Sequence, residues 1–453
     1  MSKSLHVLIV GAGIGGLLTA ILLEKAGISY HVFERAKEVK TLGQLNTRPA
    51  GAGMTVNANV LPIFEQLGML EEILGLSMVF QSLDICNEHM QQIMSLDMRE
   101  SKPVAQLHNL LLSKVPASKI TMGKKIMSLE QNQLGVMIRA SDGGTYHGDI
   151  LVGADGAYSG VRQALYKKIE KRGELPASDK EDLHVGFICM VGTTGPLDSE
   201  KYPDLKSDIA KFTQVVGKNK PYSWTVISMP GHRVSWSVKL QLDSAAHAKG
   251  MMFRNSEWGP EANEDMIKDI YNFPIPFGGV LGHLIDATPR DLISEVYLEE
   301  GLFDTWHHGR TCLIGDACHK MLPSAGQGAV SAIQDAIVLV NCIYDIEENT
   351  PQAIDAAFQE YQSLRYLRAK HQFDMSKMMG KLLIGQSLME RFTRHVFANY
   401  IPRSVLLRSF AKSVAYRPLA AFLPPVENRG SAFVEPQRPS KRYLKEQGLT
   451  VAA

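Results

Sequence analysis

The stretch LHVLIVGAGIGGLLTAILLEKAGISYHVFE, residues 5–34, decides the fold of this chain. Its apolar, β-branched start predicts a strand at Val7–Val10, and the apolar segment after the glycines predicts a helix. A second short strand is predicted at Tyr30–Phe33. The glycines before the helix have GxGxxG spacing and are Gly11, Gly13 and Gly16. Together these features predict a βαβ unit that holds a dinucleotide.

Each glycine has a physical task in such a unit. Gly11 permits the tight turn, Gly13 the close approach of a pyrophosphate, and Gly16 the close packing of helix on strand. The pyrophosphate lies at the helix N-terminus, where free N–H groups and the macrodipole favour an anion. Glu34 ends the second strand, where a carboxylate accepts a ribose hydroxyl.

The same stretch has a competing interpretation. Leu5–Leu23 is apolar enough to resemble a signal peptide or a membrane span of about 18–20 residues. Gly11 and Gly15 also form a GxxxG pair, as in membrane helices. However, no basic segment beyond Lys3 precedes the run, and its glycines fall at phosphate-binding positions. The sequence therefore favours the dinucleotide unit.

The composition is that of an ordinary globular protein. The 453 residues suffice for two or more domains, and a net charge of +1 gives no overall field for nucleic acid. The five cysteines are few, odd in number and scattered, so we expect no disulfide framework and a reducing compartment. Cys312, Cys318 and His319 lie close in sequence, but nothing beside them completes a ligand set, so we expect no metal site.

Hydrophobic patterns predict the elements that follow the first unit. Gly43–Gly53 has no such pattern and is predicted to be a loop over the ligand, in which Arg48 contacts ligand or substrate or is simply solvated. The predicted elements are helices at Ala58–Leu70 and Gln106–Leu112, strands at Lys119–Ile126, Val136–Ala140 and Thr145–His147, and a turn at Asp142–Gly144.

A second strand–turn–helix unit follows. Ile150–Val152 is predicted to be a buried strand, and Asp155 and Gly156 turn the chain. Ser159 is positioned to cap a helix whose first turn exposes Arg162. An acid, a glycine and an arginine in this arrangement suit a nucleotide phosphate.

Residues 184–300 have a different character. Strands are predicted at 185–191, 224–229 and 234–240, the last two joined by a turn at Pro230–His232, and a helix at Asn263–Tyr271. In a cofactor enzyme this sheet would cover the substrate, although a purely structural role is the alternative.

The chain then returns to the nucleotide pattern. A strand at Arg310–Ile314 ends in Gly315 and Asp316, and a glycine-rich loop with Gly326 and Gly328 precedes a helix through Leu339. Asp316 can bond a sugar-like polyol, and the N–H groups that open the helix can stabilise negative charge.

Three motifs in this order resemble the single-component FAD-dependent monooxygenases, the para-hydroxybenzoate-hydroxylase-like family. They are the GxGxxG turn with Glu34, the DGxxSxVR run at Asp155–Arg162, and GDACHKMLPSAGQG at Gly315–Gly328. The resemblance covers roughly residues 5–380. The sequence around LPASD, WGPE and LIDATP is similar to that of fungal secondary-metabolism members of this family.

The resemblance implies a set of FAD-binding residues. The first turn would bind the pyrophosphate, and Glu34 and Arg35 would contact the adenosine ribose. Asp316 would bind the ribityl chain. Asp155 and Gly156 belong to a motif linked to both FAD and NAD(P)H binding. The implied cofactor-binding positions are Gly11, Ala12, Gly13, Gly16, Glu34, Arg35, Arg48, Asp155, Gly156, Asp316, Pro323, Gly326, Gln327 and Gly328. Arg48 and Pro323 are candidates near the flavin, and no side chain is assigned as catalytic.

The chain departs from the family pattern at two positions. The usual arginine three residues before the helix leucine falls on Val104, and the asparagine common after GQG is Val330. Arg48 can compensate for the first loss, or the region is remodelled. Neither loss removes the cofactor site, but both bear on turnover.

The resemblance also implies a reaction. NADPH or NADH reduces FAD, O2 adds at flavin C4a as a hydroperoxide, and one oxygen is transferred to an apolar or aromatic metabolite of secondary metabolism by hydroxylation or epoxidation. The alternatives are a non-oxygenating flavin oxidoreductase and an impaired flavoprotein with a binding role.

The expected architecture is α/β with an added sheet domain. We expect a non-contiguous Rossmann-like FAD-binding domain at 1–183 and 301–380, an α+β substrate domain with a mixed or antiparallel sheet at 184–300, and a helical tail at 381–453. The tail's amphipathic helices either pack on the body or lie on a membrane surface, and residues from Pro436 are expected to be loose. The expected location is cytoplasmic, with peripheral membrane contact left open.

Overall fold

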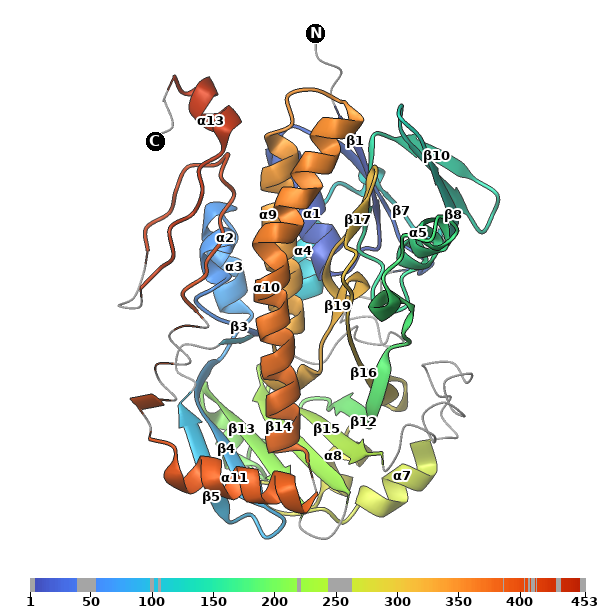
Figure 1. Ribbon diagram of the computed structural model, residues 1–453. Coiled ribbons are helices and arrows are strands. Elements are labelled where there is room, and N and C mark those ends of the chain that lie inside the picture. Colours follow the sequence, from blue (N-terminus) through green and yellow to red (C-terminus); the bar gives the residue numbers. More distant parts are fainter. Residues whose placement is uncertain are drawn as a thin grey trace.

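The computed structural model describes residues 5–38, 54–97, 102–104, 107–217, 221–242, 263–385, 387–402, 404–405, 408, 412, 414–428 and 433–448. Within them, a six-stranded sheet carries the glycine turn (Figure 1). Its neighbouring strands are parallel except at one edge. In spatial order they are β17 (His307–His308), β18 (Thr311–Leu313), β11 (Ile150–Gly153), β1 (His6–Val10), β2 (Ser29–Phe33) and β7 (Ile120–Thr121).

The central strands are apolar because they are buried on both faces. Val7–Val10 and Ile150–Gly153 are buried throughout, as expected for a parallel sheet covered by helices. The strands predicted at Val7–Val10, Tyr30–Phe33, Ile150–Val152 and Arg310–Ile314 are confirmed, with small shifts at their ends.

Helices pack against this sheet and against one another. They are α1 (Ile14–Lys25), α4 (Leu107–Lys114), α5 (Gly160–Glu170), α9 (Gly328–Tyr344) and α10 (Pro351–Leu383). α1 contacts α4 and α9, and its residues Gly15–Leu23 are all buried. The apolar run Leu5–Leu23 is therefore a core strand and helix. Across the described ranges, no helix has the length and hydrophobicity that crossing a membrane requires.

Smaller elements complete this half of the molecule. They are α2 (Leu61–Gln66), α3 (Leu70–Gly75), β3 (Met54–Val56), β6 (Lys102–Val104), β8 (Ile126–Gln131), β9 (Val136–Ala140) and β10 (Thr145–Gly148), with 3₁₀ turns at Ala117–Lys119, Ala177–Lys180, Gly315–Ala317 and Pro323–Ala325. The 3₁₀ turns Pro203–Lys206 and Arg290–Leu292 lie beside the second sheet. The helix predicted at Ala58–Leu70 is instead two short helices, separated at Gly68, whose φ is +73°. The strand predicted at Lys119–Ile126 is wrong in extent, because Gly123 with φ +73° interrupts it.

An eight-stranded sheet forms the second layer, in the lower half of Figure 1. Its strands in spatial order are β19 (His319–Lys320), β16 (Ser294–Leu302), β12 (His184–Thr193), β15 (Arg233–Gln241), β14 (Tyr222–Met229), β13 (Ile209–Val216), β4 (Val79–Asn87) and β5 (Gln92–Asp97). Only β13 and β4 are parallel to each other. The hairpin predicted through Pro230–His232 joins β14 and β15. The sheet extends beyond the predicted range 184–300, since β4, β5 and β19 also belong to it.

The two faces of this sheet have different neighbours. One face packs on α7 (Asn263–Ile270) and α8 (Leu281–Asp286) through Trp224 and Trp236. The other face carries Cys189 and Phe187, which share an apolar cluster with Leu322 and Leu383 of the first half. The second face is therefore the inner face of the molecule. α10 runs along the molecule from the first sheet to the second (Figure 1).

The tail is more ordered than its polar sequence predicts. α11 (Leu388–Tyr400) follows α10, and α13 (Lys441–Glu446) lies near the chain end. Ser440 donates a hydrogen bond to Asp345 at 2.5 Å, and Tyr344 donates one to Glu446 at 2.6 Å. The expectation that residues from Pro436 are loose is thus wrong for the described residues 436–448, because side chains at the end of α9 hold them.

Candidate functional site

Three segments far apart in sequence meet at one edge of the six-stranded sheet. β1, β11 and β18 are parallel neighbours, so their carboxyl ends lie together. Gly11 follows the first of them, Asp155 the second and Gly315 the third. The approach is close, since a Cβ added to Gly11 would lie 2.3 Å from the Ala154 oxygen. The three motifs found in the sequence therefore lie together in the fold and form one candidate site.

The glycine turn combines tight packing with one open position. Gly11 has a φ of +105°, and a Cβ on Gly16 would lie 2.0 Å from the Gly11 oxygen. In contrast, a Cβ on Gly13 would meet nothing within 4 Å. α1 begins after Gly13 without a side-chain cap. Its first turn therefore presents N–H groups beside open space, an arrangement that binds phosphate.

Glu34 lies at this turn. Its carboxylate accepts hydrogen bonds from the Ala12 N–H at 2.8 Å and the Ala36 N–H at 2.9 Å. His108 of α4 donates through Nε2 to the Ala12 oxygen at 2.7 Å. Sequence reasoning missed His108, because a helical pattern does not tell which side chain reaches a distant turn. Arg35 is exposed beside the turn.

The second motif is a closed hydrogen-bonded turn. The Asp155 carboxylate accepts from Ser159 Oγ at 2.5 Å and from the Val161 N–H at 3.1 Å. Burial raises the pKa of Asp155, although these hydrogen bonds oppose the shift. Gly156 has a φ of +82°, as its turn requires. Ser159 accepts from the Arg162 N–H at 2.9 Å, which confirms the predicted helix cap.

Arg162 does not point into solvent, and that prediction is wrong. Its guanidinium is buried, donates to the Ala317 oxygen at 2.8 Å and the Ala157 oxygen at 2.6 Å, and lies 4.2 Å from the centre of the Phe303 ring. Backbone carbonyls and an aromatic face replace the water that a surface arginine would have. Arg162 therefore connects the second motif to the third.

A buried charged cluster anchors the third motif. Asp335 of α9 accepts from the Gly315 N–H at 2.9 Å, from His319 Nε2 at 2.5 Å and from Arg365 Nε at 2.8 Å. Burial alone would raise the pKa of Asp335, but His319 and Arg365 outweigh it and hold this pKa at about 2. Sequence reasoning missed Asp335 and Arg365. The available signal was an acid inside the apolar helix AVSAIQDAIVLV.

The remaining predicted residues lie between the end of β18 and the start of α9. Asp316 is partly exposed and accepts from Lys320 Nζ at 2.7 Å. Gly326 has a φ of +63°, and α9 begins at Gly328 with Gln327 at the N-cap position, where its side chain accepts no hydrogen bond from the first turn of the helix. A Cβ on Gly328 would meet nothing within 4 Å. A second uncapped helix start thus faces open space, and Pro323 is exposed next to it.

This geometry agrees with what comparison with known proteins finds. The FAD binding domain family matches residues 4–185 and 283–376. The chain belongs to this family of FAD-dependent monooxygenases. The split match corresponds to the two segments that build the six-stranded sheet and its helices, and members use FAD with NAD(P)H.

Alignments with similar proteins cover almost the whole length of the monooxygenase. The FAD-dependent monooxygenase esdpE of Penicillium shearii is 27% identical over 94% of this chain and 89% of its own length. The FAD-dependent monooxygenase paxM of Penicillium paxilli is 28% identical with the same coverage. HpxO of Klebsiella pneumoniae, solved with FAD and uric acid, has the same fold, with a TM-score of 0.72, 19% identity, and coverage of 92% of this chain and 98% of that chain.

The departures from the family pattern have structural counterparts. Val330 is fully buried in the core, so an apolar residue packs where the family commonly has an asparagine. The backbone of Val104 pairs with Met54 between β6 and β3. Arg48, the other candidate near the flavin, lies outside the described residues of the monooxygenase.

A potential metal-ligand group in the monooxygenase is already engaged. Cys318, His319 and Asp335 approach one another within 4.8 Å. However, the Asp335 oxygens accept from His319, Arg365 and Gly315, and Arg365 supplies the balancing charge. This cluster is a buried ion pair that positions the third motif.

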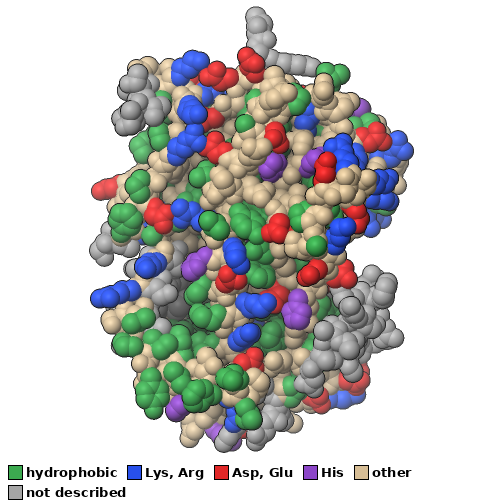
Figure 2. Space-filling model, in the orientation of Figure 1, with side chains coloured by type: hydrophobic (Ala, Val, Ile, Leu, Met, Phe, Trp, Pro, Cys, Tyr) green, Lys and Arg blue, Asp and Glu red, His purple; other side chains and the backbone are tan. Residues whose placement is uncertain are grey.

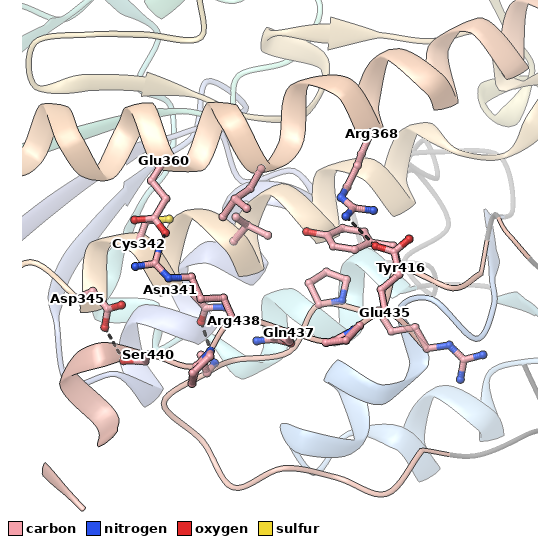
Figure 3. Close-up of a pocket in the computed structure, with 17 residues that line it drawn as sticks. Asn341, Cys342, Asp345, Glu360, Arg368, Tyr416, Glu435, Gln437, Arg438 and Ser440 are labelled. Atoms are coloured by element: carbon pink, nitrogen blue, oxygen red, sulfur yellow. Dashed lines mark hydrogen bonds and ion pairs between the residues drawn. The ribbon is translucent and has the colours of Figure 1, made fainter. Parts of the chain in front are cut away.

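A cavity of about 180 Å³ lies elsewhere, between α9, α10 and the tail (Figure 3). Four of its charged residues form two ion pairs, Arg438 with Glu360 and Arg368 with Glu435. Tyr416 stacks against Arg368 at 3.7 Å. None of the residues of the three motifs lines it, so this cavity marks how the tail docks on the monooxygenase.

Proposed function

We propose that this monooxygenase binds FAD along the shared edge of β1, β11 and β18 and adds one oxygen atom of O2 to an apolar or aromatic metabolite of secondary metabolism. The observation that carries the proposal is the pair of uncapped helix starts, at Gly13 and Gly328, that face open space on either side of the second motif. Hydroxylation and epoxidation are both compatible with it.

We assign the two ends of the cofactor as the family resemblance implies, and the open helix starts support this assignment. The turn at Gly11, Ala12, Gly13 and Gly16 takes the pyrophosphate, and Glu34, with Arg35 beside it, takes the adenosine ribose. At the other end, Asp316 takes the ribityl chain. The loop formed by Pro323, Gly326, Gln327 and Gly328 would hold the flavin ring, and Asp155 and Gly156 hold the turn between the two ends.

The chain's own contribution is positioning, charge and exclusion of water. When bound, reduced FAD supplies the electrons that activate O2. The N-terminus of α9 carries positive partial charge, which would stabilise an anionic flavin held at this loop. The inner face of the second sheet contributes Phe187, Leu298 and Val216 to an apolar cluster. These side chains suit an apolar substrate and keep water away from it.

Spectroscopy and isotope labelling test this proposal. The purified protein should show flavin absorption, and NADPH or NADH oxidation should accelerate with some members of a panel of phenols and prenylated aromatics. With ¹⁸O₂, the product should carry one labelled oxygen atom. A protein that is colourless and refuses added FAD, or one that yields only hydrogen peroxide with every compound, would contradict the proposal and favour a binding role or a non-oxygenating oxidoreductase.

We also infer a cytoplasmic enzyme whose α11 contacts an anionic lipid surface. Arg394 fixes one side of α11 to the end of α10, where it donates to the Leu382 and Gly385 oxygens. On the other side Leu388 is 83% and Phe392 65% exposed. Hydrophobic side chains gather at this lower-left region in Figure 2. An exposed apolar face with cations nearby, such as Lys381 and Arg391, favours anionic headgroups.

Vesicle sedimentation tests this contact. The wild type should sediment with phosphatidylserine-containing vesicles and less with pure phosphatidylcholine. The Leu388→Gln/Phe392→Gln variant should stay in solution. Leu134→Gln is the matched control, because Leu134 is 87% exposed in a distant turn and should not affect sedimentation. Equal behaviour of all three proteins would remove the inference.

A further inference from the structure

A buried lysine lies on the inner face of the eight-stranded sheet. Lys239 and Ser237 alternate along β15 with Trp236 and Val238, which pack on the α7–α8 side. Lys239 lies opposite Cys189 of β12, a member of the inner apolar cluster. Its side chain therefore belongs to the face that looks toward the proposed flavin ring, and it is only 8% exposed.

Strand register gathers a chain of polar groups around this lysine. Lys239 Nζ donates to Thr225 Oγ1 at 2.6 Å and to Ser237 Oγ at 3.1 Å. Thr225 in turn donates to Gln214 Oε1 at 2.7 Å. These contacts fix the direction of the ammonium group. They use two of its three N–H donors and supply only neutral oxygens.

The charge of Lys239 is not balanced within the described part of the chain. There, no carboxylate forms an ion pair with it, and burial lowers its pKa. Directly across the strand pair lies Ser223, whose hydroxyl is fully buried and makes no hydrogen bond to the described residues. An unbalanced buried amine and a buried hydroxyl without a partner each cost free energy. Their position side by side indicates a missing polar partner.

We propose that Lys239 and Ser223 bind an acidic oxygen of the substrate, such as a phenolate, enolate or carboxylate oxygen, and so orient the substrate on the inner face. This inference rests on the proposed function, since it deepens the substrate class of that site. The free N–H of Lys239 and the Ser223 hydroxyl both donate to the same oxygen. Apolar neighbours such as Phe187 and Val216 hold the rest of the molecule.

The alternative is that Lys239 has a purely structural role in the sheet. Under it, replacing Lys239 would change stability and leave ligand preference unaltered. Under the proposal, Lys239→Met is tolerated in folding, because an apolar chain of similar length replaces an unbalanced charge, while selectivity for acidic ligands is lost. Ligand selectivity therefore separates the two, whatever happens to stability.

The experiment measures binding to the FAD-loaded protein by the change in flavin absorption. The acidic probes are 1-naphthol and 1-naphthoate, and their neutral counterparts are 1-methoxynaphthalene and methyl 1-naphthoate. The wild type should bind at least one acidic probe about tenfold or more tightly than its methylated counterpart. Whether the phenol or the carboxylate shows the larger ratio identifies the source of the oxygen.

Variants assign that preference to the site. Lys239→Met should bring the ratio to about one, and Ser223→Ala should reduce it several-fold. The matched control Lys211→Met removes an exposed lysine of β13 that pairs with Asp204 at 2.7 Å, and it should keep the wild-type ratio. A wild type without acidic preference, or an unchanged ratio in Lys239→Met, overturns the inference. Loss of FAD from the wild type would instead overturn the proposed function.

Discussion

The edge of the six-stranded sheet and the inner face of the eight-stranded sheet offer a ligand different parts of the chain. The edge offers backbone groups, at glycine turns and at the uncapped helix starts of Gly13 and Gly328. The inner face offers side chains from separate strands, such as Gln214, Thr225 and Lys239. Backbone recognition requires particular residues at short spacing, whereas side-chain recognition depends on strand register.

The strongest test of this contrast compares two glycines of the first turn. Gly16→Ala should destabilise the protein by at least about 4 kcal/mol, because its Cβ would lie 2.0 Å from the Gly11 oxygen. Gly13→Ala should leave the unfolding midpoint nearly unchanged but weaken FAD binding, because its Cβ would enter the open space. Urea denaturation without FAD and FAD titration measure the two effects.

Two outcomes at these glycines would contradict the comparison. If Gly13→Ala bound FAD as tightly as the wild type, the open space at this turn would not be the pyrophosphate site. If Gly16→Ala folded normally, the close packing of α1 on β1 would not limit this position.

The buried cluster of the third motif should give the next largest effect. Asp335→Asn removes the charge that balances Arg365 and weakens the hydrogen bond from His319, and it should cost about 3–5 kcal/mol of folding free energy. The Gly315 turn should loosen with it, so FAD affinity should also fall. Ser376→Ala, a buried position on α10 whose hydroxyl makes no hydrogen bond, is the control and should cost much less. Equal costs would mean that the ion pair does not anchor this turn.

The contribution of the same cluster to stability should depend on pH in the acid range. The pKa of Asp335 is about 2 in the folded state against an ordinary 3.8, so its ionised form is stabilised by folding. This contribution, about 2 kcal/mol, is complete above about pH 4 and is lost as the pH falls toward about 2. Unfolding free energies measured from pH 5 to pH 2 should decline, and Asp335→Asn should show a flatter profile. Parallel profiles would contradict this account.

The sequence predicts the edge well for physical reasons. The GxGxxG turn, the Ser159 cap and the β14–β15 hairpin are set by residues a few positions apart, and all three are present in the structure. The split FAD-binding domain follows from motif order, and the family match confirms it. Local spacing carries these features because glycine φ angles and helix caps are local properties.

Other features depend on tertiary contacts that no local pattern contains. Arg162 looks like a surface residue until the Ala317 oxygen is seen to accept its bond. The polar tail appears loose until Asp345 is seen to hold Ser440. The Lys239 group is invisible in sequence, because its members lie on different strands and meet only through register.

Asp316→Ala gives a smaller effect within the edge. Loss of one charged hydrogen-bond acceptor for the ribityl chain should weaken FAD binding by about tenfold. Its partner Lys320 provides the control, since Lys320→Ala removes the 2.7 Å contact and leaves the carboxylate in place. Lys320→Ala should therefore retain FAD better than Asp316→Ala. Unchanged FAD affinity in Asp316→Ala would refute the role given to Asp316.

The smallest predicted effect, at Ser223, emerges when two fully buried serines are compared, one in each region. Ser159 caps α5 and donates to Asp155, so Ser159→Ala should cost about 1–2 kcal/mol. Ser223 has no hydrogen-bond partner, so Ser223→Ala should be nearly neutral in the ligand-free protein. Urea denaturation of both variants measures the difference. A comparable cost at Ser223 would mean that its hydroxyl serves the sheet itself, and the inner face would then lose one of its two donors for an acidic oxygen.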